Sequence, residues 1–122
     1  MTTRVVVVDD QEVVRAAFGA LLATQPDFTV VGTAADGAQA VRAAAREAPR
    51  LVFLDIDMPV LDGIEACRQM RAVPAMAGAK IVMLTASADD RARSRAADAG
   101  ADRFLTKPFS PLDLLRLVDE LA

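Results

Sequence analysis

The sequence predicts an α/β fold in which helices cover both faces of a parallel sheet. Five short apolar runs of strand type occur along the chain, and a segment with helical periodicity or a helix start signal follows each. This alternation favours parallel strands joined by right-handed crossovers. A length of 122 residues fits one domain that buries a core without disulfides or a structural metal. We therefore expect a single domain over residues 1–122.

Composition excludes several functional classes. The net charge of −3 argues against direct nucleic-acid binding, and no apolar run approaches the roughly 20 residues of a membrane span. The chain has no histidine, which excludes acid–base catalysis by histidine and metal sites with histidine ligands. The amino terminus lacks a signal-peptide pattern, and one cysteine, Cys67, fits a reducing compartment. We expect a cytoplasmic protein.

The first apolar run predicts a central strand. Residues 4–8 contain four consecutive valines and lead into Asp9 and Asp10. Residues 11–23 then predict an amphipathic helix, because large apolar residues recur at helical spacing: Val14, Phe18, Leu21 and Leu22.

The second unit is less aliphatic. Residues 28–33 suit an edge strand, and Asp36 with Gly37 provides a cap and turn before an alanine-rich helix over 38–48. That helix is expected to direct three residues toward the core: Val41, Ala44 and Ala45.

The third unit contains the most informative run. Residues 51–55 are apolar up to Asp55, which indicates a strand buried on both faces with an acid at its carboxyl end. Asp62 and Gly63 lead into a helix over 64–71, and a loop over 73–78 follows.

The last two units complete the alternation. Residues 80–84 predict a buried strand ending in Thr85, and a polar, shallowly packed helix over 89–98 ends at Gly100. Residues 103–105 predict a brief strand before Lys107. A final helix over 112–121 begins at Pro111 and is expected to direct to the core Leu114, Leu115, Val118 and Leu121.

Five such units fit a flavodoxin-like three-layer sandwich with strand order 2-1-3-4-5. In that order, the carboxyl ends of the strands bring five polar residues to one edge of the sheet: Asp9, Asp10, Asp55, Thr85 and Lys107. Clustered carboxylates repel one another unless a cation neutralises them, and an all-oxygen ligand set favours Mg²⁺. A carboxylate can also act as a nucleophile and form an aspartyl phosphate. Phosphoryl transfer needs neutralisation of the charge on the phosphoryl oxygens and in-line positioning of the reacting groups. Mg²⁺, the Lys107 ammonium and the Thr85 hydroxyl suit these needs.

Four motifs together resemble the receiver domain of bacterial response regulators over essentially the whole chain. They are Val7-Val8-Asp9-Asp10, Asp55-Ile56-Asp57-Met58-Pro59, Leu84-Thr85-Ala86 and Thr106-Lys107-Pro108-Phe109. The resemblance implies a two-component phosphorelay in which a histidine kinase or phosphotransfer protein phosphorylates Asp55. It describes a signalling phosphoacceptor that assists its own phosphorylation and dephosphorylation, and not a turnover enzyme.

The resemblance also implies a role for each site residue. Mg²⁺ would be held by Asp10 directly, by Asp9 mainly through water, by Asp55 and by the backbone carbonyl of Asp57. The Thr85 hydroxyl would hydrogen-bond the phosphoryl oxygens, and Lys107 would pair with them. The Lys107–Pro108 peptide is expected to be cis.

Family receivers switch when the threonine moves toward the phosphoryl group and an aromatic residue turns inward. Phe104 occupies the aromatic position but lacks the hydroxyl of the tyrosine that is frequent there. The face formed by segments 89–98, 103–105 and 112–121 would contact an output domain, an effector or a second copy of the chain.

Individual residues on that face allow two interpretations. Arg93 and Asp113 occupy positions that form intermolecular ion pairs in one subfamily, whereas Leu117 replaces an arginine that is often part of that pattern. The alternative is a solvated face on which Arg91, Arg93, Arg95 and Asp98 pair along the helix.

Two other functions stay open. The Asp55-x-Asp57 pattern resembles that of small Mg²⁺-dependent phosphohydrolases of the haloacid-dehalogenase type, but an earlier strand already carries an acidic pair and no segment could form a substrate cap. The other alternative is an interaction module that works without phosphorylation. Asp57 and Ser87 flank the site and are candidates for tuning the phosphate lifetime.

Overall fold

A computed structural model describes residues 2–86 and 90–121. The elements, in order, are β1 (Thr3–Val8), α1 (Glu12–Leu22), β2 (Phe28–Ala34), α2 (Gly37–Glu47), β3 (Leu51–Asp55), α3 (Gly63–Arg71), the short 3-10 helix η1 (Pro74–Met76), β4 (Lys80–Thr85), α4 (Asp90–Asp98), β5 (Arg103–Thr106) and α5 (Pro111–Leu121). The five predicted strand–helix units are confirmed, with η1 inside the predicted loop over 73–78.

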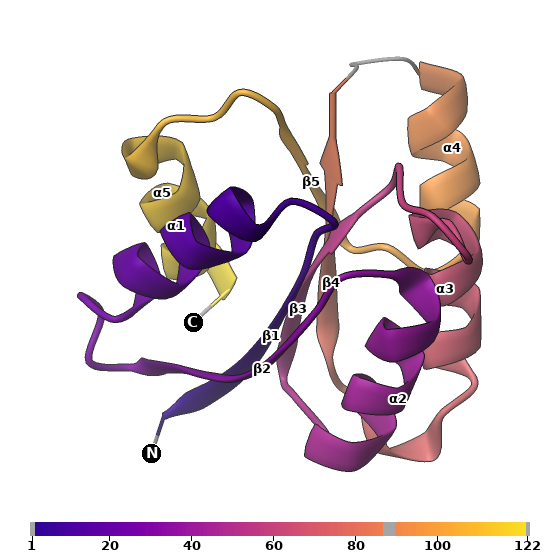
Figure 1. The fold of residues 1–122 in the computed structure, drawn as a ribbon, viewed down its shortest axis with the longest axis horizontal. Coiled ribbons are helices and arrows are strands. Elements are labelled where there is room, and N and C mark those ends of the chain that lie inside the picture. The colour runs from indigo at the N-terminus through magenta and orange to yellow at the C-terminus, as the bar shows by residue number, and fades with distance from the viewer. Residues whose placement is uncertain (1, 87–89, 122) are drawn as a thin grey trace.

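The strands form one parallel sheet in the order β2-β1-β3-β4-β5. Helices α1 and α5 cover one face of this sheet, and α2, α3 and α4 cover the other (Figure 1). This arrangement is the predicted flavodoxin-like sandwich. None of the helices in the described ranges combines the length and the apolar character that crossing a membrane requires.

The sheet separates two hydrophobic clusters. Along β3, Leu51 and Phe53 pack on the α1–α5 side, whereas Val52 and Leu54 pack on the opposite side. Every residue of β3 is buried, as expected for a central parallel strand. Side chains of β3 therefore alternate between the two hydrophobic clusters. Asp55 is the last residue of this buried strand.

One expectation about helix faces is wrong. Ala45 is exposed, because the buried face of α2 follows Gly37, Ala40 and Ala44 at helical spacing. Leu117, the position at which the intermolecular ion-pair pattern is incomplete, is buried with 8% exposure and belongs to the core. The expected core residues Leu115 and Leu121 of α5 are half-buried, whereas Leu114 and Val118 are fully inside.

Two glycines allow the starts of α2 and α3 to lie close to the loop after β3. A Cβ atom at Gly37 would lie 2.1 Å from the carbonyl oxygen of Leu61, and one at Gly63 would lie 2.1 Å from that of Asp55. The preceding acid caps each helix: the Asp36 side chain accepts a hydrogen bond from Gln39 N, and the Asp62 side chain accepts one from Glu65 N. Cap and glycine together fix the loop that carries Asp57.

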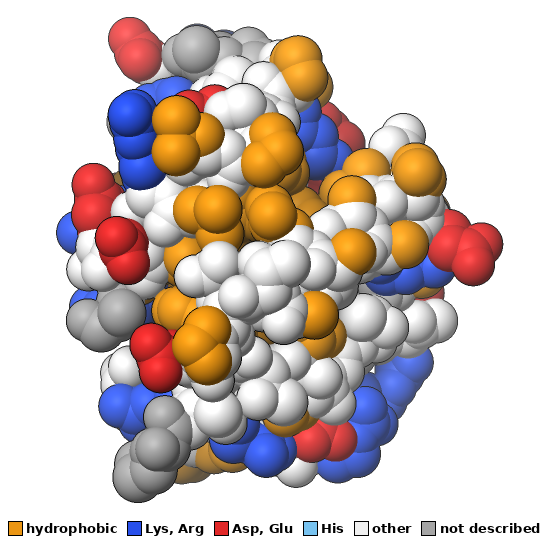
Figure 2. Space-filling model, turned by 90° about the vertical axis from the view of Figure 1, so that its left-hand side faces the viewer, with side chains coloured by type: hydrophobic (Ala, Val, Ile, Leu, Met, Phe, Trp, Pro, Cys, Tyr) orange, Lys and Arg blue, Asp and Glu red, His pale blue; other side chains and the backbone are white. Residues whose placement is uncertain are grey.

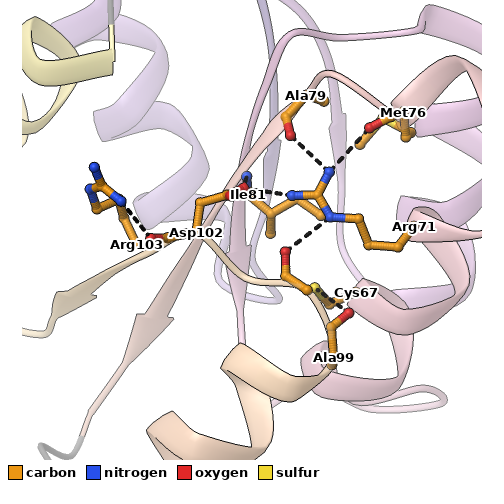
Figure 3. A network of polar contacts seen from close by, with 9 residues as sticks. Cys67, Arg71, Met76, Ala79, Ile81, Ala99, Asp102 and Arg103 are labelled. Carbon is orange, nitrogen blue, oxygen red and sulfur yellow. Dashed lines mark hydrogen bonds and ion pairs between the residues drawn. The ribbon is translucent and has the colours of Figure 1, made fainter.

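A polar network joins α3 to the amino ends of β4 and β5 (Figure 3). The Arg71 guanidinium donates hydrogen bonds to the carbonyl oxygens of Gly100, Met76 and Ala79, and it pairs with the Asp102 carboxylate at 2.5 Å. The same carboxylate accepts a hydrogen bond from Ile81 N at 2.8 Å. Arg71 thus satisfies three carbonyl groups where helices and loops meet.

Cys67 lies beside this network and is a core residue. Its thiol is buried, and its sulfur lies 3.5 Å from the carbonyl oxygen of Ala99. Burial raises the pKa of the thiol to about 11, which keeps it protonated at neutral pH.

Candidate functional site

The carboxyl ends of four strands bring the predicted polar residues together. Asp9 and Asp10 follow β1, Asp55 ends β3, Thr85 ends β4 and Lys107 follows β5. One carboxylate oxygen from each of the three acids lies within 4.8 Å of the others. The site therefore forms at the switch point of the sheet, where β1 and β3 are neighbours.

Lys107 links two of these acids. Its Nζ donates a hydrogen bond to Asp9 Oδ2 at 2.7 Å and lies 3.6 Å from Asp55 Oδ2. Burial acts to lower the pKa of Lys107, but the hydrogen bond to Asp9 and the charges of Asp55 and Asp9 outweigh it and raise that pKa. The backbone of Lys107 is tied to β4, because Lys107 N donates a hydrogen bond to Thr85 O at 2.7 Å. The Lys107–Pro108 peptide is cis, as predicted.

Asp9 is fully buried and fixed from three directions. Its Oδ1 accepts a hydrogen bond from Gln11 N at 2.9 Å, while Oδ2 accepts the one from Lys107. The guanidinium of Arg15 donates to the carbonyl oxygen of Asp9 at 2.6 Å. Arg15 was not among the predicted site residues, although it lies one turn into the helix that follows Asp9 and Asp10.

Asp55 is 5% exposed, and its Oδ1 accepts a hydrogen bond from Asp57 N at 3.2 Å. Burial raises the pKa of Asp55 from 3.8 to about 6, and the charges of Asp9 and Asp10 add to this effect. Lys107 and the Asp57 N–H oppose it without cancelling it. The isolated site therefore holds more negative charge than it can neutralise with its own residues.

The donor set fits a hard divalent cation. Its ligands are carboxylate oxygens, Asp10 is exposed toward solvent, and the side chain of Asp57 is also exposed. Such a site can offer a few protein oxygens while leaving coordination positions to water, which is how Mg²⁺ is usually bound. A cation here would also oppose the burial and the neighbouring negative charges that raise the pKa of Asp55.

The switch residues predicted on β4 and β5 lie next to this centre. Thr85 is buried with 4% exposure and is paired with Thr106 across the two strands, and Met83 is paired with Phe104. Phe104 is half-buried, and the guanidinium of Arg93 lies over its ring. The interpretation of Arg93 as part of a solvated face is therefore wrong. Ser87 lies outside the described residues.

An apolar groove that sequence analysis did not anticipate runs between α1 and α5 and reaches the site. Its cavity of about 960 Å³ is lined by Val13, Ala17, Leu21 and Leu114 along the helices, and by Lys107 at the site. Figure 2 shows hydrophobic side chains gathered around this hollow on the side of the molecule where α1 and α5 lie. Val13, at the start of α1, is 73% exposed.

Comparisons with known proteins agree with this geometry. A family model described as the response regulator receiver domain matches residues 5–119. The response regulator protein VraR of Staphylococcus aureus is 38% identical over 115 residues, which are 93% of this chain and 54% of that protein. The chain thus spans about half the length of the curated relatives it matches.

Solved structures show the same likeness. The receiver domain of a sensor histidine kinase from Pseudomonas aeruginosa is 32% identical, with a TM-score of 0.87 over 98% of this chain and 97% of that one. That structure is described as having a magnesium ion coordinated in its active site cleft. The chemotaxis protein CheY4 of Vibrio cholerae is 27% identical, with a TM-score of 0.91 over the full length of both chains.

Proposed function

Since the chain belongs to the response regulator receiver domain family, we propose that it accepts a phosphoryl group on Asp55 in a Mg²⁺-dependent reaction. The observation that carries this proposal is the position of Asp55 at the end of β3. Its Oδ2 lies 3.6 Å from Lys107 Nζ, and its carboxylate is grouped with those of Asp9 and Asp10. A nucleophile, a cation and a metal-binding pair thus share one edge of the sheet.

In the proposed step, a carboxylate oxygen of Asp55 attacks the phosphorus of a phosphohistidine on the partner. The O–P bond forms as the P–N bond breaks, and the imidazole nitrogen leaves with the electron pair of that bond. Mg²⁺ held by Asp10, Asp9, Asp55 and the Asp57 carbonyl would supply charge neutralisation on the phosphoryl oxygens. Because the pKa of Asp55 is about 6, the carboxyl is mostly ionised and nucleophilic near neutral pH.

The product is stabilised by the residues that surround Asp55. The Lys107 ammonium is 3.6 Å from Asp55 Oδ2 and therefore close to the charge that arrives. The Thr85 hydroxyl would donate to a phosphoryl oxygen, and its movement would leave room for Phe104 to turn inward. Nearly two added negative charges are a sufficient local change to bias such a two-state element.

The donor would be a histidine kinase or a phosphotransfer protein, and the protein would work in the cytoplasm as a signalling phosphoacceptor. The α4–β5–α5 face would transmit the change to an output domain, an effector or a second copy. In support, α4 is shallowly packed, with Ala96 as its buried residue. A shallowly packed helix can shift at low cost.

The test is intact-mass analysis after incubation with acetyl phosphate, in Mg²⁺ and in EDTA. We expect one phosphoryl adduct that requires Mg²⁺ and is lost in Asp55→Asn. Release of inorganic phosphate from a small phosphate ester by a folded sample, without an adduct, would instead indicate a phosphohydrolase. A folded sample that forms no adduct and releases no phosphate would contradict both activities.

A further inference from the structure

Arg93 connects α4 to two residues of β5. Its guanidinium carbon lies 5.4 Å from the centroid of the Phe104 ring, and its Nη2 donates a hydrogen bond to Thr106 Oγ1 at 3.1 Å. Phe104 and Thr106 are two positions apart on a strand, so their side chains share one face of the sheet. One arginine therefore contacts both the aromatic switch residue and the residue that precedes Lys107.

These contacts join α4 to β5. The helix is polar, and within its described residues the buried one is Ala96. An arginine that stacks on an aromatic ring and donates to a hydroxyl combines two favourable interactions in a partly desolvated place. The contacts of Arg93 with β5 thus add to the apolar packing of Ala96.

The arrangement is also incompletely satisfied. Arg93 Nε is buried and has no hydrogen-bond partner within the described part of the chain. A buried donor without an acceptor costs free energy, which partly offsets the stack and the hydrogen bond. The unpaired donor thus lowers the net stability of the present position of Arg93.

We propose that Arg93 is a tether that holds Phe104 in its present position and must release the ring when the domain is phosphorylated. This inference rests on the proposed function. Thr85 is paired with Thr106 across the two strands, so a movement of Thr85 toward Asp55 disturbs the partner strand at the residue that accepts the hydrogen bond of Arg93. If Phe104 turns inward, the guanidinium loses the face of its ring. Arg93 therefore favours the arrangement seen here and opposes phosphorylation.

The first experiment compares phosphorylation rates at a sub-saturating concentration of acetyl phosphate with Mg²⁺. Arg93→Met keeps an unbranched stem but removes the cation and its donors, and we expect phosphorylation about threefold to tenfold faster than in the wild type. Arg95→Met is the matched control, because Arg95 is an exposed arginine on the same helix, and its rate should equal that of the wild type. Arg93→Lys retains a cation for the ring and should restore most of the slower rate.

The second experiment does not depend on phosphorylation. A double-mutant cycle of Arg93→Met and Phe104→Leu, measured by urea unfolding, should show a coupling of about threefold in the unfolding constant. An adduct on Asp55 at an unchanged rate in Arg93→Met, together with additive effects in the cycle, would overturn the tether and leave the proposed function intact. No adduct in the wild type would overturn the proposed function, and the cycle would then decide whether the stack itself exists.

Discussion

Lys107 Nζ is 2.7 Å from Asp9 Oδ2 but 3.6 Å from Asp55 Oδ2, so the ammonium hydrogen-bonds Asp9 and leaves Asp55 less neutralised. This unequal sharing helps to explain why burial still raises the pKa of Asp55 to about 6 despite a nearby cation. The pair with Asp9 holds Lys107 at the place where a phosphoryl group would add charge.

The raised pKa of Asp55 predicts an unusual pH dependence of stability in EDTA. Because the folded state binds this proton more tightly than the unfolded state, Asp55 favours folding at pH below 3.8, and this contribution is lost as pH rises through about 6. Asp55→Asn should therefore exceed the wild type in free energy of unfolding by roughly 1 to 3 kcal/mol at pH 7.5. The difference should shrink toward pH 4 in urea titrations, and a pH-independent difference would contradict it.

Two substitutions separate side-chain from backbone ligation of Mg²⁺. Asp10→Ala removes a carboxylate and should weaken Mg²⁺ binding about tenfold or more in calorimetric titration. Asp57→Ala keeps the carbonyl oxygen that we assign to the metal and should stay within about twofold of the wild type. Equal losses in the two variants would show that the Asp57 side chain takes part.

The geometry at Lys107 predicts that charge alone cannot replace it. Lys107→Arg keeps the charge, but a planar fork does not fit the space of a point donor between Asp9 and Asp55, so phosphorylation should fall strongly. Lys107→Met leaves the fully buried Asp9 without its cation and should cost about 3 kcal/mol of unfolding free energy. Normal phosphorylation of Lys107→Arg would remove Lys107 from the proposed mechanism.

Sequence patterns were sufficient for the sheet and for the convergence of the site. Strands buried on both faces have continuous apolar runs, and in a parallel sheet the residues that end those runs must meet at one edge. Asp55 and Thr85 could be placed for that reason, because each directly ends an apolar run.

The contacts of long side chains between elements could not be predicted in this way. The contacts of Arg15 were not predicted, and Arg93 was wrongly assigned to a solvated face. The position of a guanidinium group depends on how its helix packs on the sheet, and the spacing of residues within the helix does not reveal it. Leu117 was absent from the expected core residues of α5 for a related reason: a small rotation of α5 decides which of its neighbouring leucines is buried.

Arg71 offers a test of the network at the opposite end of β4 and β5. Arg71→Met would leave the carbonyl oxygens of Gly100 and Ala79 without this donor and break the pair with Asp102, so we expect a loss of roughly 2 to 4 kcal/mol in urea unfolding. Arg68→Met is the control on the same helix, because its pair with Glu65 is largely exposed, and it should change stability by about 0.5 kcal/mol or less. Similar losses in both variants would mean that helix propensity, and not the network, sets the effect.

The two glycines at positions 63 and 19 should respond in opposite directions to a single methyl group. A Cβ at Gly63 would lie 2.1 Å from the carbonyl oxygen of Asp55, so Gly63→Ala must push α3 away from the end of β3, at a cost of about 1 to 3 kcal/mol. A Cβ at Gly19 would meet nothing within 4 Å, so Gly19→Ala should stabilise α1 by about 0.5 to 1 kcal/mol. Because Asp55 would move with its carbonyl, Gly63→Ala should also weaken Mg²⁺ binding, whereas Gly19→Ala should leave it unchanged. Equal Mg²⁺ affinity in both variants would show that the start of α3 does not position Asp55.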